Sequence, residues 1–425
     1  MAMNFPWGGW GRLLICCSLA FPMAGMAQTN VSALLTGIES ATDRSQAQNL
    51  LNQLWLLDST KTYLQAETIQ RHWEESGGGI TRTQADTLMR IYAIGCKHDP
   101  HGSGKWLLLR ARLALSQPDL HPRQTLGLMM EAIALAPRET PPFLYTEAGH
   151  LLAREYKSIN LSLNAAAKDW VTLDRALLER KVSDPQGAAE WARIQEQLTL
   201  EMRSCFPDCR QLQGDFSEAI GQGNLPPDAC ETFLVICSLQ GCDESQAWEE
   251  ALQCALKAGE NPWLHRLAGA EAFNRGQIAR SRTHWQKACS LEVALPLQAS
   301  DQLQIAATYQ QEKDFREARS CIQAAMDRQP GWGVPYLQLM DLYLAGSETC
   351  KMSAFERKAL HWLLIDLCLK LSAIDESCSM EANQRYYAYL KACPTKEEAA
   401  FYGWKAGDTY PLKCWMSTAT TVRLP

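Results

Sequence analysis

Residues 299–332 decide the fold, and they read ASDQLQIAATYQQEKDFREARSCIQAAMDRQPGW. Counting from Ala299, alanines stand at positions 8, 20 and 27, and Pro330 stands at position 32. Larger apolar residues stand at positions 7, 11 and 24, and these are Ile305, Tyr309 and Ile322. The spacing predicts two helices whose backbones approach closely where the side chains are small. Pro330 ends the second helix because it has no amide hydrogen to continue it.

The same spacing recurs on both sides of this stretch. From Pro262, the small or apolar positions are Ala268, Gly269, Ala272, Ser281, Trp285 and Ala288. From Gly333, they are Leu339, Met340 and Tyr343. This pattern resembles the tetratricopeptide repeat (TPR), in which helix pairs stack in sequence into a superhelix. The chain is therefore expected to be all-α, a TPR-like α–α superhelix.

The flanking segments also follow a helical period, although they diverge from the repeat. Predicted helices are 46–56, 61–75, 83–95, 105–116, 122–135, 140–155, 163–181, 186–203, 228–239, 244–258, 354–373 and 379–392. Residues 407–425 alternate with a period of two, which predicts a short extended or β C-terminal tail. The expected organisation is a signal peptide at 1–27, a divergent helical region at 28–203, TPR-like repeats at 204–345, and terminal helices with the tail at 346–425.

The first residues have the pattern of an export signal. Arg12 precedes the apolar run Leu13 to Ala20, and small residues lead up to Ala27, after which cleavage is expected. Lipidation at Cys16 or Cys17, or an uncleaved anchor, are alternatives. No later stretch is long and apolar enough to span a bilayer, so no transmembrane segment is expected after signal removal. The formal net charge of −6 argues against nucleic acid as a partner.

The cysteines agree with export. There are 16 in the chain, which favours disulfides in an oxidising compartment, although free cysteines also suit tightly packed helix pairs. We expect Cys209 to pair with Cys242, because both lie at ends of neighbouring helices. We also expect Cys350 to pair with Cys414, which would tie down the tail. Cys205 and Cys209 have three intervening residues, which is unlike a redox dithiol.

Several motifs resemble a family of exported TPR proteins of the Gram-negative envelope. They are Gln329-Pro-Gly-Trp-Gly-Val-Pro-Tyr, Asp341-Leu-Tyr, Gly407-Asp-Thr-Tyr, Lys413-Cys-Trp-Met and Thr420-Thr-Val-Arg423. The resemblance covers about 205–425, and the many extra cysteines depart from it. It implies this architecture and a location in the periplasm, at the outer membrane or at the cell surface. Binding to a protein or peptide is its default role.

No sequence motif for catalysis is present: the chain lacks a Walker A loop, a Gly-x-Ser-x-Gly elbow and a His-Glu-x-x-His pair. Cys96, His98, Asp99 and His101 could hold zinc, but a polar loop is the simpler interpretation. We therefore expect no enzyme, cofactor or metal site. The alternative is an envelope enzyme, carbohydrate-processing or thiol-redox, with an unrecognised helical site. A structural envelope protein held at the outer membrane by a partner is a third interpretation.

The first helix of each pair should line a concave partner-binding surface. The candidate residues are Trp263, Arg266, Phe273, Asn274, Leu303, Gln310, Gln311, Leu337, Asp341 and Leu344. Their mixture of aromatic, apolar and amide groups suits a peptide or a helix. The alternative is that these residues pack against the chain's own N-terminal helices. If the surface is free, charge reversal at Arg266 with Phe273→Ala should abolish capture without unfolding.

Overall fold

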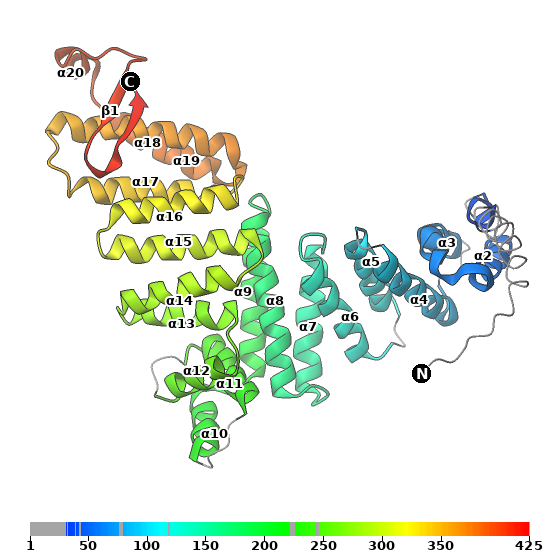
Figure 1. Cartoon of the computed structure of the whole chain (residues 1–425). Helices are drawn as coiled ribbons and strands as arrows, with labels where there is room; N and C mark the ends of the chain where they lie inside the picture. Colours follow the sequence, from blue (N-terminus) through cyan, green and yellow to red (C-terminus); the bar gives the residue numbers. More distant parts are fainter. Residues whose placement is uncertain are drawn as a thin grey trace, which may run out of the picture. The chain divides into compact units, whose positions relative to one another are not determined.

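The structure is a computed structural model that describes residues 31–424, apart from positions 32, 39, 42–43, 76–79, 100, 118–119, 222–225 and 243–245. The predicted signal peptide and its cleavage site lie outside the described residues. The described part consists of α-helices with one short two-stranded sheet (Figure 1). It divides into two compact units, one ending at Glu139 and the other spanning Thr140–Pro425. This division falls inside residues 28–203, the segment predicted from the sequence to be one divergent helical region.

The first unit contains helices that contact their neighbours in chain order. They are α2 (Arg44–Asp58), the 3₁₀ helix η1 (Ser59–Gln65), α3 (Ala66–Glu75), α4 (Arg82–His98), α5 (Ser103–Leu115) and α6 (Pro122–Leu135). Trp73, Leu88, Ile91 and Tyr92 are almost fully buried at their centre. Pro122 occupies the first turn of α6, where its missing amide hydrogen costs nothing.

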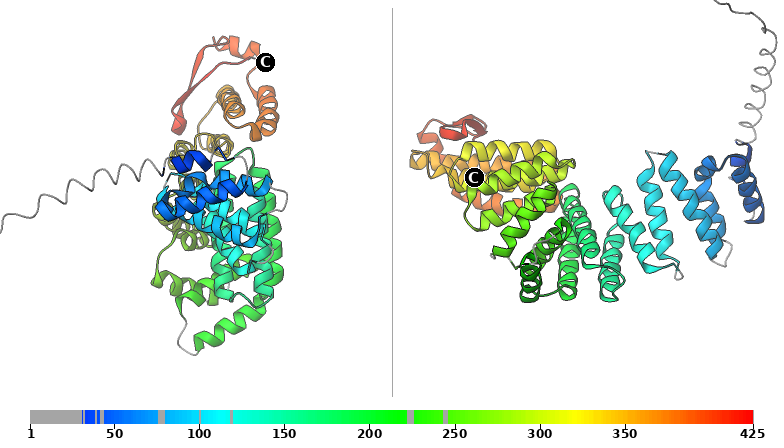
Figure 2. Two further views of the ribbon diagram at one scale, coloured as in Figure 1. Left: turned by 90° about the vertical axis from the view of Figure 1, so that its right-hand side faces the viewer. Right: turned by 60° about the horizontal axis from the view of Figure 1, so that its bottom comes forward.

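The second unit begins with three long helices that contact one another, and it continues as stacked helix pairs. Its helices are α7 (Pro142–Lys157), α8 (Leu163–Ser183), α9 (Ala188–Cys205), α10 (Cys209–Gly221), α11 (Pro227–Gln240), α12 (Gln246–Ala258), α13 (Pro262–Asn274), α14 (Ile278–Leu291), α15 (Leu295–Gln311), α16 (Phe315–Arg328), α17 (Val334–Ser347), α18 (Ala354–Ile374), α19 (Ser379–Ala392) and α20 (Lys396–Phe401). From α13 to α17 each helix packs on the next, as Figures 1 and 2 show. The all-α superhelix predicted from the spacing is therefore confirmed.

Small side chains bring the paired helices together at the predicted positions. A Cβ atom on Gly269 of α13 would lie 2.8 Å from Nε1 of Trp285 on α14, so only glycine fits there. Ser281 of α14 donates a 2.7 Å hydrogen bond to the Gly269 carbonyl, which satisfies its buried hydroxyl. Between α15 and α16, Ala306 and Ala318 are fully buried. The close approach follows from the absence of larger groups at these contacts.

One helix connection occurs twice, once in each unit. Asp99 between α4 and α5 accepts hydrogen bonds from the Gly102 amide and from Trp106 Nε1, both at 3.0 Å. Asp184 between α8 and α9 accepts the same two bonds, from the Gly187 amide at 3.1 Å and from Trp191 Nε1 at 2.8 Å. Each carboxylate thus caps the first turn of the next helix and orients a buried indole. The Asp-Pro-x-Gly-x-x-x-Trp spacing behind this geometry is visible in the sequence.

The C-terminal tail forms an antiparallel hairpin packed on α18. Strand β1 (Thr409–Leu412) pairs with β2 (Thr418–Thr421), with Thr409 opposite Thr421 and Leu412 opposite Thr418. The 3₁₀ turn η3 (Cys414–Met416) connects them, and a second 3₁₀ turn, η2 (Glu376–Cys378), precedes α19. Asp366 of α18 accepts hydrogen bonds from Thr420 Oγ1 at 2.6 Å and Arg423 Nε at 2.7 Å. The predicted extended tail is therefore confirmed.

Candidate partner-binding face

The predicted binding residues lie on α13, α15 and α17, the first helices of three successive pairs. We use the name α13–α15 face for Trp263, Arg266, Phe273, Asn274, Leu303, Gln310 and Gln311. The side chains on α13 and α15 reach each other directly. Arg266 donates to Asp301 from Nε to Oδ1 at 2.8 Å and from Nη2 to Oδ2 at 2.9 Å. The two helices therefore lie side by side.

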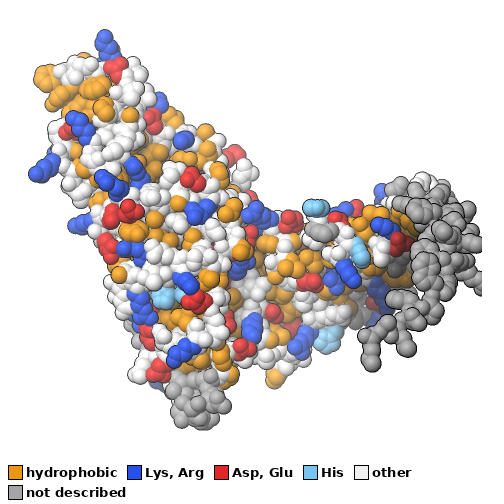
Figure 3. All heavy atoms as spheres, viewed as in Figure 1, with side chains coloured by type: hydrophobic (Ala, Val, Ile, Leu, Met, Phe, Trp, Pro, Cys, Tyr) orange, Lys and Arg blue, Asp and Glu red, His pale blue; other side chains and the backbone are white. Residues whose placement is uncertain are grey.

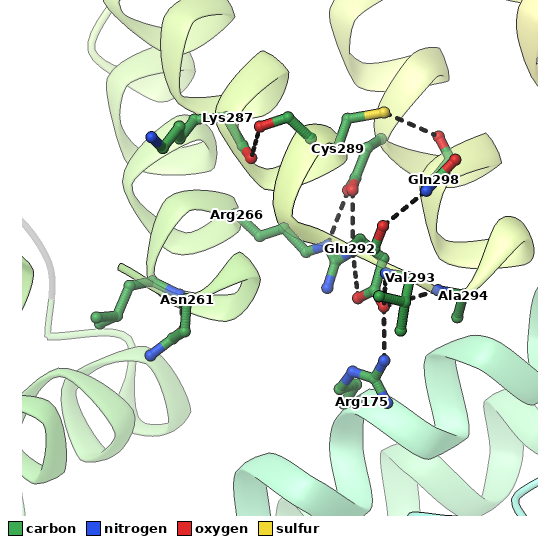
Figure 4. Close-up of polar contacts among 12 residues, drawn as sticks. Arg175, Asn261, Arg266, Lys287, Cys289, Glu292, Val293, Ala294 and Gln298 are labelled. Atoms are coloured by element: carbon green, nitrogen blue, oxygen red, sulfur yellow. Dashed lines mark hydrogen bonds and ion pairs between the residues drawn. The ribbon is translucent and has the colours of Figure 1, made fainter. Parts of the chain in front are cut away.

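Arg266 takes part in a buried network of charged side chains (Figure 4). Its Nη2 also donates to Glu292 at 3.0 Å, in the connection between α14 and α15. Glu292 in turn accepts a 2.6 Å hydrogen bond from Arg175 of α8. The side chains of Glu292 and Asp301 are each only 1 % exposed, and that of Arg266 is 11 % exposed. Buried charges of this kind are stabilised only when each one is paired.

The pKa values of the network follow from burial and pairing. Burial raises the pKa of the Asp301 carboxyl, although Arg266 opposes that shift. Burial also acts against the charged form of Glu292, but the Ala294 amide and Arg175 outweigh it, so the pKa of Glu292 is lowered. For Arg266, burial is outweighed by the hydrogen bonds that it donates to Asp301, and its pKa is raised. The arginine is therefore charged at every pH at which the protein folds.

Helix α8 covers part of the α13–α15 face. It packs against α15, and Val182 of α8 belongs to the same buried core as Ala299 and Leu303. Leu303 is only 6 % exposed. Arg266 and Leu303 thus contact other residues of this chain, although the sequence predicts that they contact a partner. The expectation that charge reversal at Arg266 leaves the fold intact does not agree with this burial.

The carboxyl ends of α13 and α15 carry the part of the face that remains accessible. Asn274 and Gln311 are exposed, and Phe273 and Gln310 are half-buried. Trp263, at the other end of α13, is also half-buried. An aromatic ring flanked by amide groups presents both apolar surface and hydrogen-bonding capacity, which is the chemistry of peptide contacts.

On α17 the predicted residues have neighbours from the chain itself. Leu337 and Leu344 are partly buried and pack beside the C-terminal core. Asp341 is exposed and accepts a 2.5 Å hydrogen bond from Nη1 of Arg385 on α19. The structure thus brings together the α13 and α15 residues and gives those of α17 a different environment.

Three cysteine pairs lie at disulfide distance among the described residues. Cys209 and Cys242 are joined with their Cα atoms 5.4 Å apart, and Cys350 and Cys414 with their Cα atoms 6.1 Å apart. These are the two pairs named from the sequence. Cys230 and Cys254 form the third, between α11 and α12. Sequence reasoning missed it because fourteen cysteines outside the predicted signal allow many connectivities.

Asp99, one of the four residues considered as zinc ligands, has a structural role instead. The Asp99 carboxylate is occupied by the Gly102 amide and the Trp106 indole, and the Trp106 hydrogen bond is the largest cause that lowers its pKa. Within the described residues, no group of three potential metal ligands is assembled. Across the same residues, no helix is long and apolar enough to cross a membrane.

Three comparisons with known proteins were informative only in part. No family model matches the chain, and no curated protein matches it. Among solved structures, the chain is similar to one described as "Circular tandem repeat protein with novel repeat topology and enhanced subunit contact surfaces". The identity is 11 % and the TM-score is 0.21, with 88 % of this chain and 95 % of the other covered.

Proposed function

We propose that this chain is an exported, non-catalytic scaffold of the TPR kind, which holds a protein or peptide of the cell envelope. The partner lies against the carboxyl-terminal part of the α13–α15 face, at Phe273, Asn274, Gln310 and Gln311. One observation carries the proposal. These four residues stay accessible on two adjacent helices, while α8 and the Arg266 network occupy the other end of the same face.

The fold supports this role because a helical repeat presents side chains in register along its stack. The small-residue contacts at Gly269, Ser281, Ala306 and Ala318 favour the TPR assignment, since they occur at the spacing of that repeat. The charged groups of the face favour a non-catalytic role. Arg266, Asp301 and Glu292 neutralise one another in structural pairs, which leaves amides and an aromatic ring for contact.

Export is supported by the three cysteine pairs at disulfide distance, because disulfides persist in oxidising compartments. The surface charge agrees with a protein partner better than with nucleic acid. In the view of Figure 3, acidic and basic side chains are interspersed over the described residues, without an extended basic area on that side.

Site-specific photo-crosslinking in native cells tests the proposal. A photoreactive residue at Gln311 should yield a discrete adduct with one protein, and the adduct should be lost when Phe273→Ala is added. The matched control is a photoreactive residue at Gln286, an exposed position on α14. Adducts of equal pattern and yield from both positions, or an adduct at Gln311 that survives Phe273→Ala and Asn274→Ala together, would contradict binding at this face.

Export is tested separately on the mature protein. Cleavage after Ala27 predicts a polypeptide in the envelope fraction whose N-terminal residue is Gln28, as N-terminal sequencing would show. A full-length chain in the cytosolic fraction would remove the exported part of the proposal.

A further inference from the structure

A hollow of about 670 Å³ lies beside α16, on a different helix from the α13–α15 face. It is lined by side chains of α16, by Leu339 and Tyr343 of α17, and by Ser417 and Thr418 of the hairpin. We call the hairpin connection around Cys414–Thr418 the lip of this hollow. Its volume is within the range of sites that bind small molecules. All of these elements belong to the second compact unit.

Two arginines line this hollow without an acidic partner. Among the described residues, no carboxylate lies within ion-pair distance of Arg316 or Arg319. By contrast, the half-buried Arg266, Arg275 and Arg282 all pair with carboxylates. Arg319 is itself half-buried, donates a hydrogen bond to the Met416 carbonyl, and also hydrogen-bonds with the Tyr343 side chain. A guanidinium has five N–H donors, so Arg319 keeps donors for a ligand while its position is held.

The lip that holds Arg319 is rigid. Cys414 and Ser417 have φ angles of 69° and 40°, in the left-handed region that non-glycine residues rarely adopt. The Cys350–Cys414 disulfide and the Trp415 side chain hold this conformation. Trp415 stacks against Phe315 and Tyr343, with both ring centroids 5.5 Å away. Its Nε1 also donates to the Gly346 carbonyl at 3.1 Å. A site built this way loses little entropy on binding.

The rest of the lining is rich in groups that recognise hydroxyls. Ser320 and Gln323 of α16 face the same hollow as Ser417 and Thr418 of the lip. Leu339 adds an apolar side chain to the lining, as contact with the C–H face of a sugar ring requires.

The charges of the lining limit what the ligand can be. Glu317 and Asp327 also line the hollow, so its two arginines and two acids cancel in formal charge. Asp327 is already engaged by Gln323, which donates to it at 3.0 Å. A multiply charged phosphate would meet repulsion from both acids, whereas a single carboxylate needs only Arg319.

We propose that this hollow binds a small, hydroxyl-rich molecule that carries one carboxylate, such as a hexuronic acid. Arg319 pairs with the carboxylate, Ser320 and Thr418 bond to hydroxyls, and Leu339 contacts the ring. The proposal does not depend on partner binding at the α13–α15 face.

Saturation-transfer NMR with the complete mature chain tests this inference, with sodium glucuronate and glucose as probes. Glucuronate should bind saturably, and glucose should bind at least about tenfold more weakly, because a charge-assisted hydrogen bond contributes a factor of that order. Arg319→Gln should weaken glucuronate binding by about tenfold or more. Ser320→Phe should abolish it by filling the hollow from an exposed position. Arg357→Gln, which removes an exposed charge on α18, should leave binding unchanged.

The inference would be overturned by no saturable binding of glucuronate to the folded chain, by equal binding of glucose and glucuronate, or by equal weakening by Arg357→Gln and Arg319→Gln. If Arg319→Gln alters the circular dichroism spectrum, its effect on binding cannot be separated from an effect on the fold, and the Ser320→Phe variant provides the test. Undiminished binding in a folded Ser320→Phe protein would then exclude this hollow as the site. Acetate binding as tight as glucuronate would exclude recognition of the hydroxyls.

Discussion

Arg266 of α13 and Asp301 of α15 form a two-bond ion pair between the first helices of two consecutive pairs. Glu292 joins the same guanidinium and connects it to Arg175, so four side chains link α8, α13 and α15. The network is therefore part of what holds α8 on the repeat face. Because its two carboxylates are buried, every member depends on the others for compensation.

Removing Arg266 should destabilise the second unit. Arg266→Met leaves Asp301 buried without a partner, and a loss of about 3–5 kcal/mol in the free energy of unfolding is expected. Urea denaturation followed by tryptophan fluorescence measures it. Arg357→Met, at an exposed position, should stay within about 0.5 kcal/mol of the parent protein. An unchanged urea midpoint in Arg266→Met would show that the network contributes nothing.

The Asp184 cap should matter for both α9 and the Trp191 indole. Asp184→Ala removes two acceptors at once, so a loss of about 1–2 kcal/mol in the free energy of unfolding is expected. Trp191→Phe removes only one hydrogen bond, but it leaves a cavity where the larger indole was. Thermal unfolding of both single variants and the double variant provides the test. Because the two side chains bond directly at 2.8 Å, their effects should be smaller together than their sum. Strict additivity would argue against coupling.

The Cys350–Cys414 bond should hold the hairpin connection on α16 and α17. Cys414→Ser is expected to lower the free energy of unfolding by about 2–4 kcal/mol, since the bond closes a long loop. Lys413 is already exposed, so loss of the bond should speed cleavage there by trypsin in limited proteolysis by letting the connection unfold locally. Cys205→Ser, which removes a free thiol, serves as the control. Equal rates of cleavage at Lys413 in both variants would contradict an anchoring role.

Two of the free thiols, those of Cys321 and Cys368, should react slowly with alkylating reagents at neutral pH. Burial raises the pKa of Cys321 to about 11, and it raises the pKa of Cys368 to about 11 as well. The reactive thiolate is then a very small fraction. Mass spectrometry of the native chain after brief iodoacetamide treatment should find these two sites unmodified, and denaturation in urea should make them reactive. Rapid native modification of Cys321 would show that it is more accessible than the structure indicates.

Stability should fall below about pH 6.5 because of the His265–His284 pair. The two rings share a hydrogen bond between their Nδ1 atoms at 3.0 Å. Burial lowers the pKa of both, with Glu260 opposing the shift at His265 and His265 adding to it at His284. A lowered folded pKa means that the unfolded chain binds protons first. The contribution is therefore complete above about pH 6.5 and is lost as pH falls towards the lowered values.

Thermal unfolding between pH 5 and 8 tests this dependence. The midpoint should rise with pH across the window, and His284→Asn should flatten the rise while preserving a hydrogen bond to His265. Glu249, Arg280 and Lys287 also act on the pair through their charges. A parent profile that is flat from pH 5 to 7 would exclude the pair as a source of pH dependence.

Much of the fold could be predicted from local spacing. Ala306 and Ala318 mark where two helices touch because the requirement for small side chains is tied to fixed positions along the chain. The alternation of Thr418, Thr420 and Val422 likewise predicts a strand, since alternate residues face the same side. The Asp99 and Asp184 caps belong to this class as well. Their shared spacing was present in the sequence, and a search for eight-residue repeats would have found it.

The accessible part of the α13–α15 face could not be predicted in the same way. Residue spacing placed Arg266 and Phe273 on one side of α13. It could not reveal that α8 returns to pack on α15 and reaches the Arg266 network through Glu292. That contact depends on Arg175, which lies 117 residues before Glu292.

The sequence by itself determined the helix pairs, their order and the extended tail, because each depends on residues within one repeat length. Only the tertiary structure decided which faces stay open, that Cys230 pairs with Cys254, and where Arg319 is left without an acid. Those outcomes depend on contacts between distant segments, and such contacts form only when the whole chain has packed.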